Sequence, residues 1–165
     1  MRDDARVLVV EPLPPSDPRA VRALREFMAE MSSRFTGREA TDDDVREALR
    51  EFPSDDLLEP EGLLLVAHRD GVAVGCAGLR RLGDGLGEVK RVWVSPGSRR
   101  QGLGRRLMAE IERHARERGL RELRLDTRSD LVESRRLYEQ LGYREVEPFG
   151  ANPYAAHWFV KRLDL

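Results

Sequence analysis

The segment VWVSPGSRRQGLGRR, residues 92–106, carries most of the information about the fold and the function of this 165-residue chain. An apolar strand pattern ends at Ser95-Pro96-Gly97, and two further glycines, Gly102 and Gly104, then lead directly into a helical pattern. Free backbone N–H groups at a helix N-terminus point outward and carry partial positive charge. Because glycine has no Cβ atom, an anion can come into contact with such amides. The same turn holds Arg99, Arg100, Arg105 and Arg106. The segment therefore predicts a binding site for phosphate or pyrophosphate.

Three known phosphate-binding patterns compete for this segment. The loop of the P-loop nucleotide hydrolases needs a lysine and a hydroxyl residue after its last glycine, and neither follows Gly102 or Gly104. The dinucleotide fingerprint needs a small residue where this chain has Leu107. Asp126 lies near the place of a ribose-binding acid, so a dinucleotide-binding protein stays open as a distant alternative. The third pattern, Arg/Gln-x-x-Gly-x-Gly/Ala, is matched in full by residues 99–104.

Strand and helix patterns alternate on both sides of this segment. Short apolar or alternating runs predict strands, and apolar residues at helical spacing behind a cap predict helices. Strands are expected over residues 6–11, 63–68, 72–82, 87–94, 120–126, 143–146 and 156–163. Helices are expected to begin at Ser16, Thr41, Leu103 and Asp130, with stops at Pro53, Gly119 and Gly142 for the last three. The three central strands are joined by turns so short that they must form an antiparallel meander. The order β-α-α-β-β-β-α-β-α-β-β predicts an α/β fold with a mixed sheet covered by helices on both faces.

Length and composition bound the class of protein. A chain of 165 residues with 40% hydrophobic residues fits a single domain over residues 1–165. The only cysteine, Cys76, excludes an internal disulfide framework and is expected to be a small buried hydrophobe. Three histidines without clustered acids predict no metal site. A net charge of −1 argues against a nucleic-acid partner. No apolar stretch suits a membrane span or a signal peptide, so we expect a cytoplasmic protein without a membrane partner.

Two motifs in the right order resemble the GNAT superfamily of N-acetyltransferases. The first is Arg99-x-x-Gly102-x-Gly104, set between a strand that ends in Val-x-Val-x-Pro and an amphipathic helix. The second is SRRLYEQLGY, residues 134–143, which is similar to the Ala-x-x-Leu-Tyr-x-x-x-Gly-Phe helix end of that family. The resemblance covers residues 63–163 well and the helical N-terminal third in outline. It implies the acyl-CoA N-acyltransferase fold, in which the mixed sheet is partly splayed.

The resemblance also implies acetyl-CoA, or coenzyme A, as the cofactor. In this family the loop amides bind the pyrophosphate, and a bulged strand before the loop pairs with the pantetheine arm. On this sequence the implied residues are Val92, Trp93, Val94, Arg99, Arg100, Gln101, Gly102, Leu103, Gly104, Arg105, Ser134 and Tyr138. Ser134 replaces the usual alanine, and the asparagine often found near Leu131 is missing, which puts contacts from that position in doubt. The alternative is an ordinary strand and helix cap with surface arginines.

Two residues are implied as catalytic. An alkylamine with a pKa near 10 is mostly protonated at neutral pH, so a general base helps the reaction. Family members that use a glutamate base carry it at the position of Glu88, which implies Glu88 as the base or as an anion that binds the substrate. Tyr138 matches the tyrosine acid of the family, whose phenol assists the departing thiolate. The alternatives are a surface carboxylate paired with Lys90 or Arg91, and a tyrosine of the core.

The acceptor pocket is expected from the helical N-terminal third, the end of the meander and the last loop. The residues named for it are Phe27, Met31, Phe35, Glu88, Tyr154, His157 and Trp158. Endings with Asn-Pro and a Trp-Phe pair resemble those of bacterial members of the superfamily. An aromatic patch that closes the sheet edge would explain the same residues.

The function expected from the sequence is N-acetyl transfer from acetyl-CoA to an unidentified amine by direct attack in a ternary complex. The acceptor is a small-molecule amine or a protein amino group, and a homodimer stays open because dimers are common in this family. Cys76 has no histidine beside it in sequence, so an acyl-enzyme route lacks support. A non-catalytic domain that binds or senses acyl-CoA is the alternative from another class.

Overall fold

The computed structural model describes residues 7–129 and 131–164. Arg6 and Asp130, where the first strand and the last helix were expected to begin, lie outside the described residues. The order of elements agrees with the sequence prediction, with one additional short 3₁₀ turn, η1, at Pro96–Ser98. Among the described residues, no helix is both long and apolar enough to cross a membrane.

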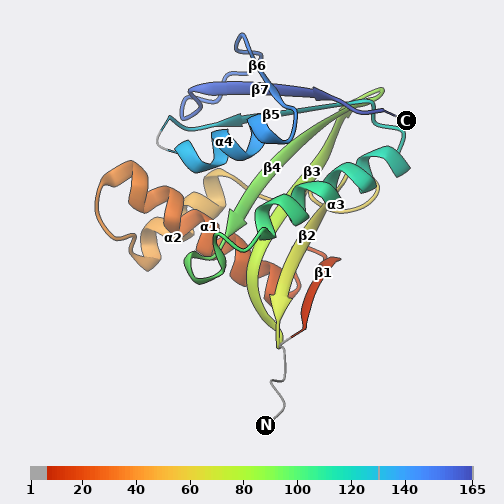
Figure 1. The fold of residues 1–165 in the computed structure, drawn as a ribbon. Coiled ribbons are helices and arrows are strands. Elements are labelled where there is room, and N and C mark those ends of the chain that lie inside the picture. The colour runs from red at the N-terminus through yellow and green to blue at the C-terminus, as the bar shows by residue number, and fades with distance from the viewer. Residues whose placement is uncertain (1–6, 130, 165) are drawn as a thin grey trace.

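Seven strands form one mixed sheet in the order β1-β2-β3-β4-β5-β7-β6 (Figure 1). Their bounds are β1 Leu8–Pro12, β2 Gly62–Arg69, β3 Val72–Gly83, β4 Leu86–Val94, β5 Glu122–Thr127, β6 Arg144–Val146 and β7 His157–Arg162. The predicted meander of β2, β3 and β4 is antiparallel, as are the pairs β1–β2, β5–β7 and β6–β7. Only β4 and β5 run parallel. The sheet is therefore mixed, as predicted.

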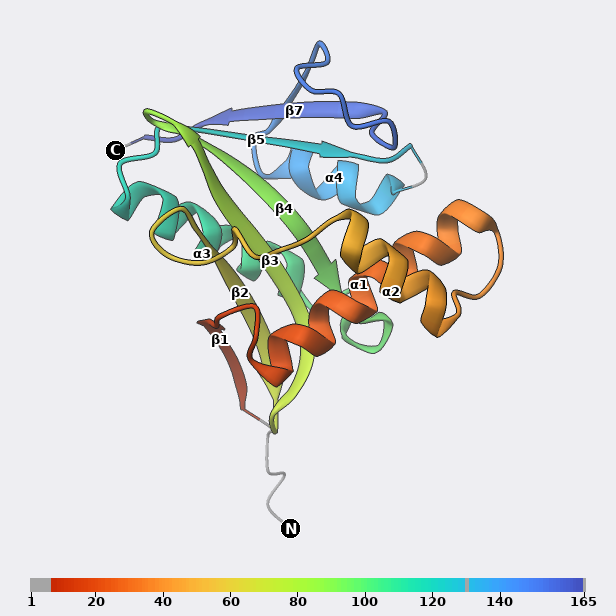
Figure 2. The ribbon, with the colours of Figure 1, turned by 180° about the vertical axis from the view of Figure 1, so that it is seen from behind.

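The parallel pair separates after a few residues. Residues Leu86–Glu88 of β4 pair with Glu122–Arg124 of β5, and the pairing then stops although β4 continues to Val94 and β5 to Thr127. The two strands diverge in Figures 1 and 2 toward the end of the molecule where α1 and α4 lie. The splay expected from the family resemblance is thus present, and it leaves the later half of β4 without a strand partner on this side.

Four helices cover the two faces of the sheet. Their bounds are α1 Pro18–Thr36, α2 Asp42–Glu51, α3 Leu103–Glu117 and α4 Val132–Gln140. Helices α1 and α2 lie on one face, and α3 and α4 lie on the other (Figures 1 and 2). Each face has its own apolar core: Ala23 and Leu24 of α1 pack with Leu64 of β2, whereas Leu107 and Ile111 of α3 pack in a second cluster. The predicted coverage of both faces is confirmed.

Caps explain where the helices begin and end. Asp17 accepts a hydrogen bond from the Arg19 N–H ahead of α1, and Thr41 forms a capping box with Asp44 at the start of α2. Helix α3 ends in a Schellman motif: Gly119 adopts a left-handed conformation, and the N–H of the next residue, Leu120, donates to the Ala115 carbonyl. Leu120 therefore terminates a helix, and β5 begins later than the sequence predicted.

Candidate functional site

The loop before α3 has the backbone of an anion-binding turn. After η1, Arg100 and Gly102 both adopt left-handed conformations, with φ of 63° and 78°. Gly102 is the N-cap of α3, and no side chain caps the helix there. The first N–H groups of a helix have no intrahelical partner, and no capping side chain occupies them in this loop. The sequence-based expectation of a phosphate-accepting helix N-terminus agrees with this geometry.

Gly104 lies at a close contact between two helices. A Cβ atom at Gly104 would lie 3.2 Å from Cδ2 of Leu137 and 3.8 Å from Cγ2 of Val94. The missing side chain therefore lets α4 approach the first turn of α3 closely, where β4 ends. The two sequence motifs, which are far apart in the chain, meet at this contact.

The arginines of the loop do not all face the predicted anion. The Nε atom of Arg99 donates to the Val94 carbonyl at 3.0 Å, and its Nη2 atom donates to Glu30 of α1 at 2.5 Å. Arg105 donates to Gln140 of α4 at 2.8 Å. The side chain of Arg99 thus ties the loop to α1, while its backbone stays in the loop as expected.

Strand β4 carries the bulge that the family resemblance implied. The register passes from Cys76–Trp93 to Gly78–Lys90, so two residues of β4 lie opposite Ala77. One of them, Arg91, has a φ of 57°, and its carbonyl accepts a hydrogen bond from the Cys76 thiol at 3.1 Å. Cys76 is fully buried, as predicted, and burial raises the pKa of its thiol to about 12.

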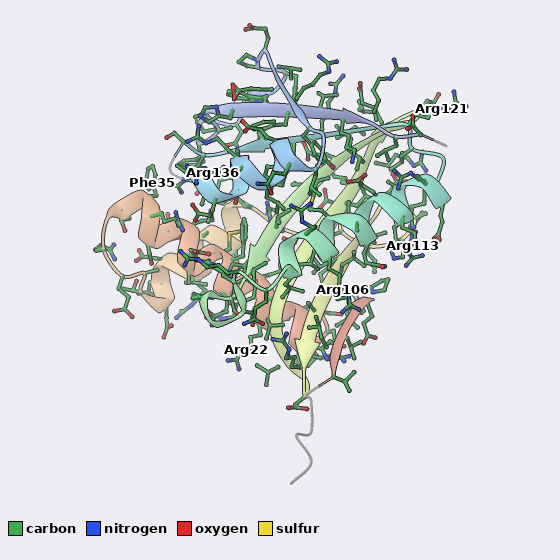
Figure 3. The ribbon with its side chains drawn as sticks, viewed as in Figure 1. Arg22, Phe35, Arg106, Arg113, Arg121 and Arg136 are labelled. Carbon is green, nitrogen blue, oxygen red and sulfur yellow. The ribbon has the colours of Figure 1, made fainter. Side chains whose placement is uncertain are left out.

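A cavity of about 990 Å³ lies where β4 and β5 diverge, and residues of α1, α2, α4 and the segment between β6 and β7 also line it. It brings together eight of the predicted site residues: Phe27, Met31, Phe35, Glu88, Val92, Ser134, Tyr138 and Tyr154. The ring of Tyr154 packs edge-on against Phe35 at 5.2 Å and against Phe52 at 5.7 Å. Phe35 projects from the end of α1 (Figure 3). The guanidinium carbon of Arg128 lies 5.9 Å from the centre of its ring.

Two predicted acceptor residues do not line this cavity. His157 binds Glu145 of β6 through Nδ1 at 2.8 Å. Trp158 lies under the segment between β6 and β7, where its indole nitrogen is 3.8 Å from the Cβ position of Gly150. This indole nitrogen is buried without a hydrogen-bond partner. The structure therefore does not bring these two side chains to the cavity together with the other residues named for the acceptor pocket.

Glu88 reaches the cavity as a paired carboxylate. It lies opposite Arg80 in the β3–β4 register, and Arg80 donates to it at 2.9 Å. The second Arg80 nitrogen binds Asp56 at 3.0 Å, and the Lys90 ammonium lies 4.0 Å from Glu88. The sequence considered Lys90 or Arg91 as partners, whereas the strongest contact comes from the neighbouring strand.

Tyr138 belongs to the core and to the cavity at once. Its ring is buried and packs against Tyr143 at 5.9 Å and Phe159 at 6.1 Å. The residue also lines the cavity, and burial raises the pKa of its phenol above the ordinary value. The phenol is therefore protonated at neutral pH.

Sequence reasoning did not place Asp126 in this cavity. Asp126 lies near the end of β5 and lines the cavity wall. Its Oδ1 atom accepts a hydrogen bond from the Asn152 amide at 3.1 Å, and burial raises the pKa of its carboxyl. The alternation of β5 contained the signal, because Leu123, Leu125 and Thr127 are buried and Asp126 must face the other side.

The residues of this site do not resemble a metal centre. In the described parts of the chain, no three His, Cys, Asp or Glu side chains gather as metal ligands. Its carboxylates are held instead by arginine and amide nitrogens.

Comparisons with known proteins agree with this geometry. The sequence profile of the Acetyltransferase (GNAT) family matches residues 23–143. An uncharacterised N-acetyltransferase of Schizosaccharomyces pombe is 32% identical over 132 residues, which cover 79% of this chain and 77% of that protein. The IAA acetyltransferase of Azospirillum brasilense is 40% identical over 99 residues, and this chain spans 63% of its length.

Solved structures show the same fold. The PaiA N-acetyltransferase of Thermoplasma acidophilum, in complex with coenzyme A, superposes with a TM-score of 0.71 and 19% identity over 95% of this chain and 99% of that one. With the loop, the splayed strands and the cavity, these matches lead to one conclusion: the chain belongs to the GNAT family of acetyltransferases.

Proposed function

We propose that this protein transfers the acetyl group of acetyl-CoA directly to a primary amine. The observation that carries the proposal is the junction of an uncapped α3 N-terminus, a splayed β4–β5 pair and a cavity that holds Glu88 and Tyr138. A solved relative of the same fold was crystallised with coenzyme A. When bound, acetyl-CoA supplies a thioester that an amine can attack.

The residues present fit this cofactor. The amides from Gly102 to Arg105 would hold the pyrophosphate, since glycines keep the loop open and no side chain caps the helix. The part of β4 that β5 leaves open on one side, Val92–Val94, would hold the pantetheine arm through its backbone, because β5 has separated from it there. Ser134 of α4 lines the cavity beside this path.

The side chains favour direct transfer over an acyl-enzyme. Cys76 is buried on the α1 side of the sheet, and the raised pKa of its thiol opposes formation of the thiolate. Glu88 offers a negative charge to the substrate ammonium, and Tyr138 offers a protonated phenol to the departing sulfur. The acceptor is held by the aromatic part of the cavity, in which Phe35 and Tyr154 pack together.

Thermal unfolding with acetyl-CoA tests the cofactor, with NAD and ATP as controls. A ligand at 100 times its Kd stabilises the fold by about 2.7 kcal/mol, which corresponds to a Tm rise of roughly 5–10 °C for this length. A rise with acetyl-CoA alone supports the proposal, and no rise at millimolar concentration contradicts it. Thiol release with spermidine, tyramine, lysine and a peptide with a free α-amine then tests turnover.

Tyr138→Phe separates an enzyme from an acyl-CoA sensor. The substitution keeps the buried ring and removes only the hydroxyl. In an enzyme we expect thiol release to fall about 10-fold to 100-fold while the acetyl-CoA-induced Tm rise stays unchanged. A wild-type protein that binds acetyl-CoA but releases no thiol with any probe amine would favour the sensor.

A further inference from the structure

Asp126 and Glu88 are two carboxylates on one wall of the cavity. In the parallel pair, Glu88 lies opposite Arg124, and Asp126 follows Arg124 by one strand repeat on the same face of β5. The pairing of the two strands stops at Arg124, so Asp126 lies in the part of β5 that no longer pairs with β4. Both side chains therefore border the opening between the two strands, and both line the cavity.

The two carboxylates differ in their partners. Glu88 is bound by the Arg80 guanidinium at 2.9 Å, so accepting a proton would break an ion pair. The hydrogen bond of Asp126 comes from the uncharged amide of Asn152. A carboxylate that gives up no ion pair on protonation is the better proton acceptor near neutral pH.

Asn152 holds Asp126 in a defined orientation. Its Oδ1 atom accepts a hydrogen bond from the Tyr154 N–H at 3.0 Å, which turns its amide nitrogen toward Asp126. Among the residues that the structure describes, none forms a hydrogen bond with the second oxygen of Asp126, which leaves that oxygen to meet a substrate. Asn152 is thus a positioning residue within the same loop that supplies Tyr154 to the cavity.

We propose that Asp126 is the proton acceptor of the transfer reaction, and that Glu88, held by Arg80, binds the substrate ammonium. This inference rests on the proposed function and assigns the two roles to different residues. The ammonium gives one proton to Asp126, and the free amine then attacks the thioester carbonyl carbon. The new C–N bond forms as the C–S bond breaks, with its electron pair leaving on sulfur. The phenol of Tyr138 protonates the sulfur and is reprotonated by the second proton that leaves the nitrogen. The amide and the thiol are then complete, and Asp126 releases its proton to water.

The charges around Asp126 support this role. From β4, Glu88 raises its pKa, and Lys90 and Arg91 lower it. From α4, the buried Tyr138 phenol lies close enough for Asp126 to raise its pKa in turn. Burial is the largest influence and raises the Asp126 pKa overall, toward the range in which a base works best.

The experiment compares Asp126→Asn with Glu88→Gln, with the exposed Asp84→Asn as control. Asparagine keeps the size and can still accept the Asn152 hydrogen bond. With the best amine of the probe panel, we expect Asp126→Asn to lower kcat/KM about 100-fold or more near pH 7, with an unchanged KM for acetyl-CoA. This deficit should shrink about tenfold per pH unit toward the amine pKa, because only substrate already deprotonated can react. Glu88→Gln should mainly raise the amine KM, and Asp84→Asn should change nothing.

Two outcomes overturn the inference. One is an Asp126→Asn profile that stays parallel to that of the wild type, which indicates a structural role. The other comes from carboxyl ¹³C NMR of the wild-type protein without substrate, with the resonance assigned through Asp126→Asn. Titration well above the ordinary Asp range supports the inference, and titration within that range contradicts it. This second readout needs no turnover. It therefore tests the assignment of Asp126 even if the proposed reaction itself is wrong.

Discussion

The fold moves the pKa values of individual carboxyls in opposite directions. Asp44 caps α2 and is bound by Arg38 at 2.8 Å, and the Arg38 hydrogen bond is the largest cause that lowers its pKa. This half-buried carboxyl favours folding above its unfolded pKa of 3.8 and loses that contribution as the pH falls. Asp126 is the reverse case, because burial raises its pKa. The ionised carboxylate of Asp44 therefore stabilises the fold, whereas the ionised carboxylate of Asp126 destabilises it.

We predict that Asp126→Asn stabilises the protein at neutral pH. A carboxyl whose folded pKa is raised favours folding below its unfolded pKa of 3.8, and this contribution disappears as the pH rises through the folded pKa. Asparagine removes the buried charge, so the variant should unfold at a higher Tm than the wild type near pH 7. The difference should vanish near pH 4. Thermal unfolding of both proteins across this range measures the difference, with Asp84→Asn as the control. A variant whose Tm near pH 7 is no higher than that of the wild type would contradict the prediction.

The sequence predicted which single residues line the cavity better than it predicted the contacts of their side chains. Tyr138 was named from a motif and Glu88 from its position in the family resemblance, and both line the cavity. Arg80, the partner of Glu88, depends on the register of two strands, which the sequence does not specify. The role of Arg99 was incomplete for a similar reason, because Glu30 lies in a helix far away in the chain. Contacts between distant segments need the assembled fold.

Whole elements were predicted better than their ends. Proline, caps and glycine stops placed all four helices, because these signals act within one turn of the chain. The strands predicted to begin at Leu120 and Tyr143 begin two and one residues later, at Glu122 and Arg144. In both cases the predicted first residue donates its N–H back into the preceding helix. Its apolar side chain is typical of a strand and of a Schellman motif alike.

At the scale of elements, the conformation of the proposed cofactor loop depends on Gly102. With a φ of 78°, it holds a conformation that costs other residues about 1–2 kcal/mol. We therefore expect Gly102→Ala to lower the free energy of unfolding by about 1 kcal/mol and to reduce the Tm rise with acetyl-CoA. Gly97→Ala is the matched control, since a Cβ atom there meets nothing within 4 Å and its φ is not left-handed. Urea unfolding measures the first effect, and thermal unfolding with and without acetyl-CoA measures the second. Equal behaviour of the two variants in both measurements would refute the role of Gly102.

At the scale of the whole molecule, the two faces of the sheet are joined across the splayed strands. Arg99 of the loop before α3 binds Glu30, and Arg34 of α1 binds both Glu30 and Glu133 of α4. Arg128, after β5, donates to the Met31 carbonyl of α1 at 3.0 Å. Helix α1 carries acceptor-side residues of the cavity, so these contacts connect the proposed cofactor loop to the proposed acceptor pocket.

This arrangement predicts measurable coupling between Arg99 and Glu30. A double-mutant cycle of Arg99→Gln and Glu30→Gln should give an interaction energy of about 1 kcal/mol in urea unfolding, because residues in one bonded network are not additive. The exposed pair Arg46–Asp43, with side chains 65% and 90% accessible, should give a value near zero. Glu30→Gln should also weaken acetyl-CoA binding although it lies outside the loop, since releasing the Arg99 guanidinium removes the restraint on the loop backbone. If instead the Arg99–Glu30 cycle is as additive as that of the exposed pair, or acetyl-CoA binds Glu30→Gln as tightly as the wild type, α1 and the loop are independent. The cavity and the loop would then be neighbours in space without being linked in energy.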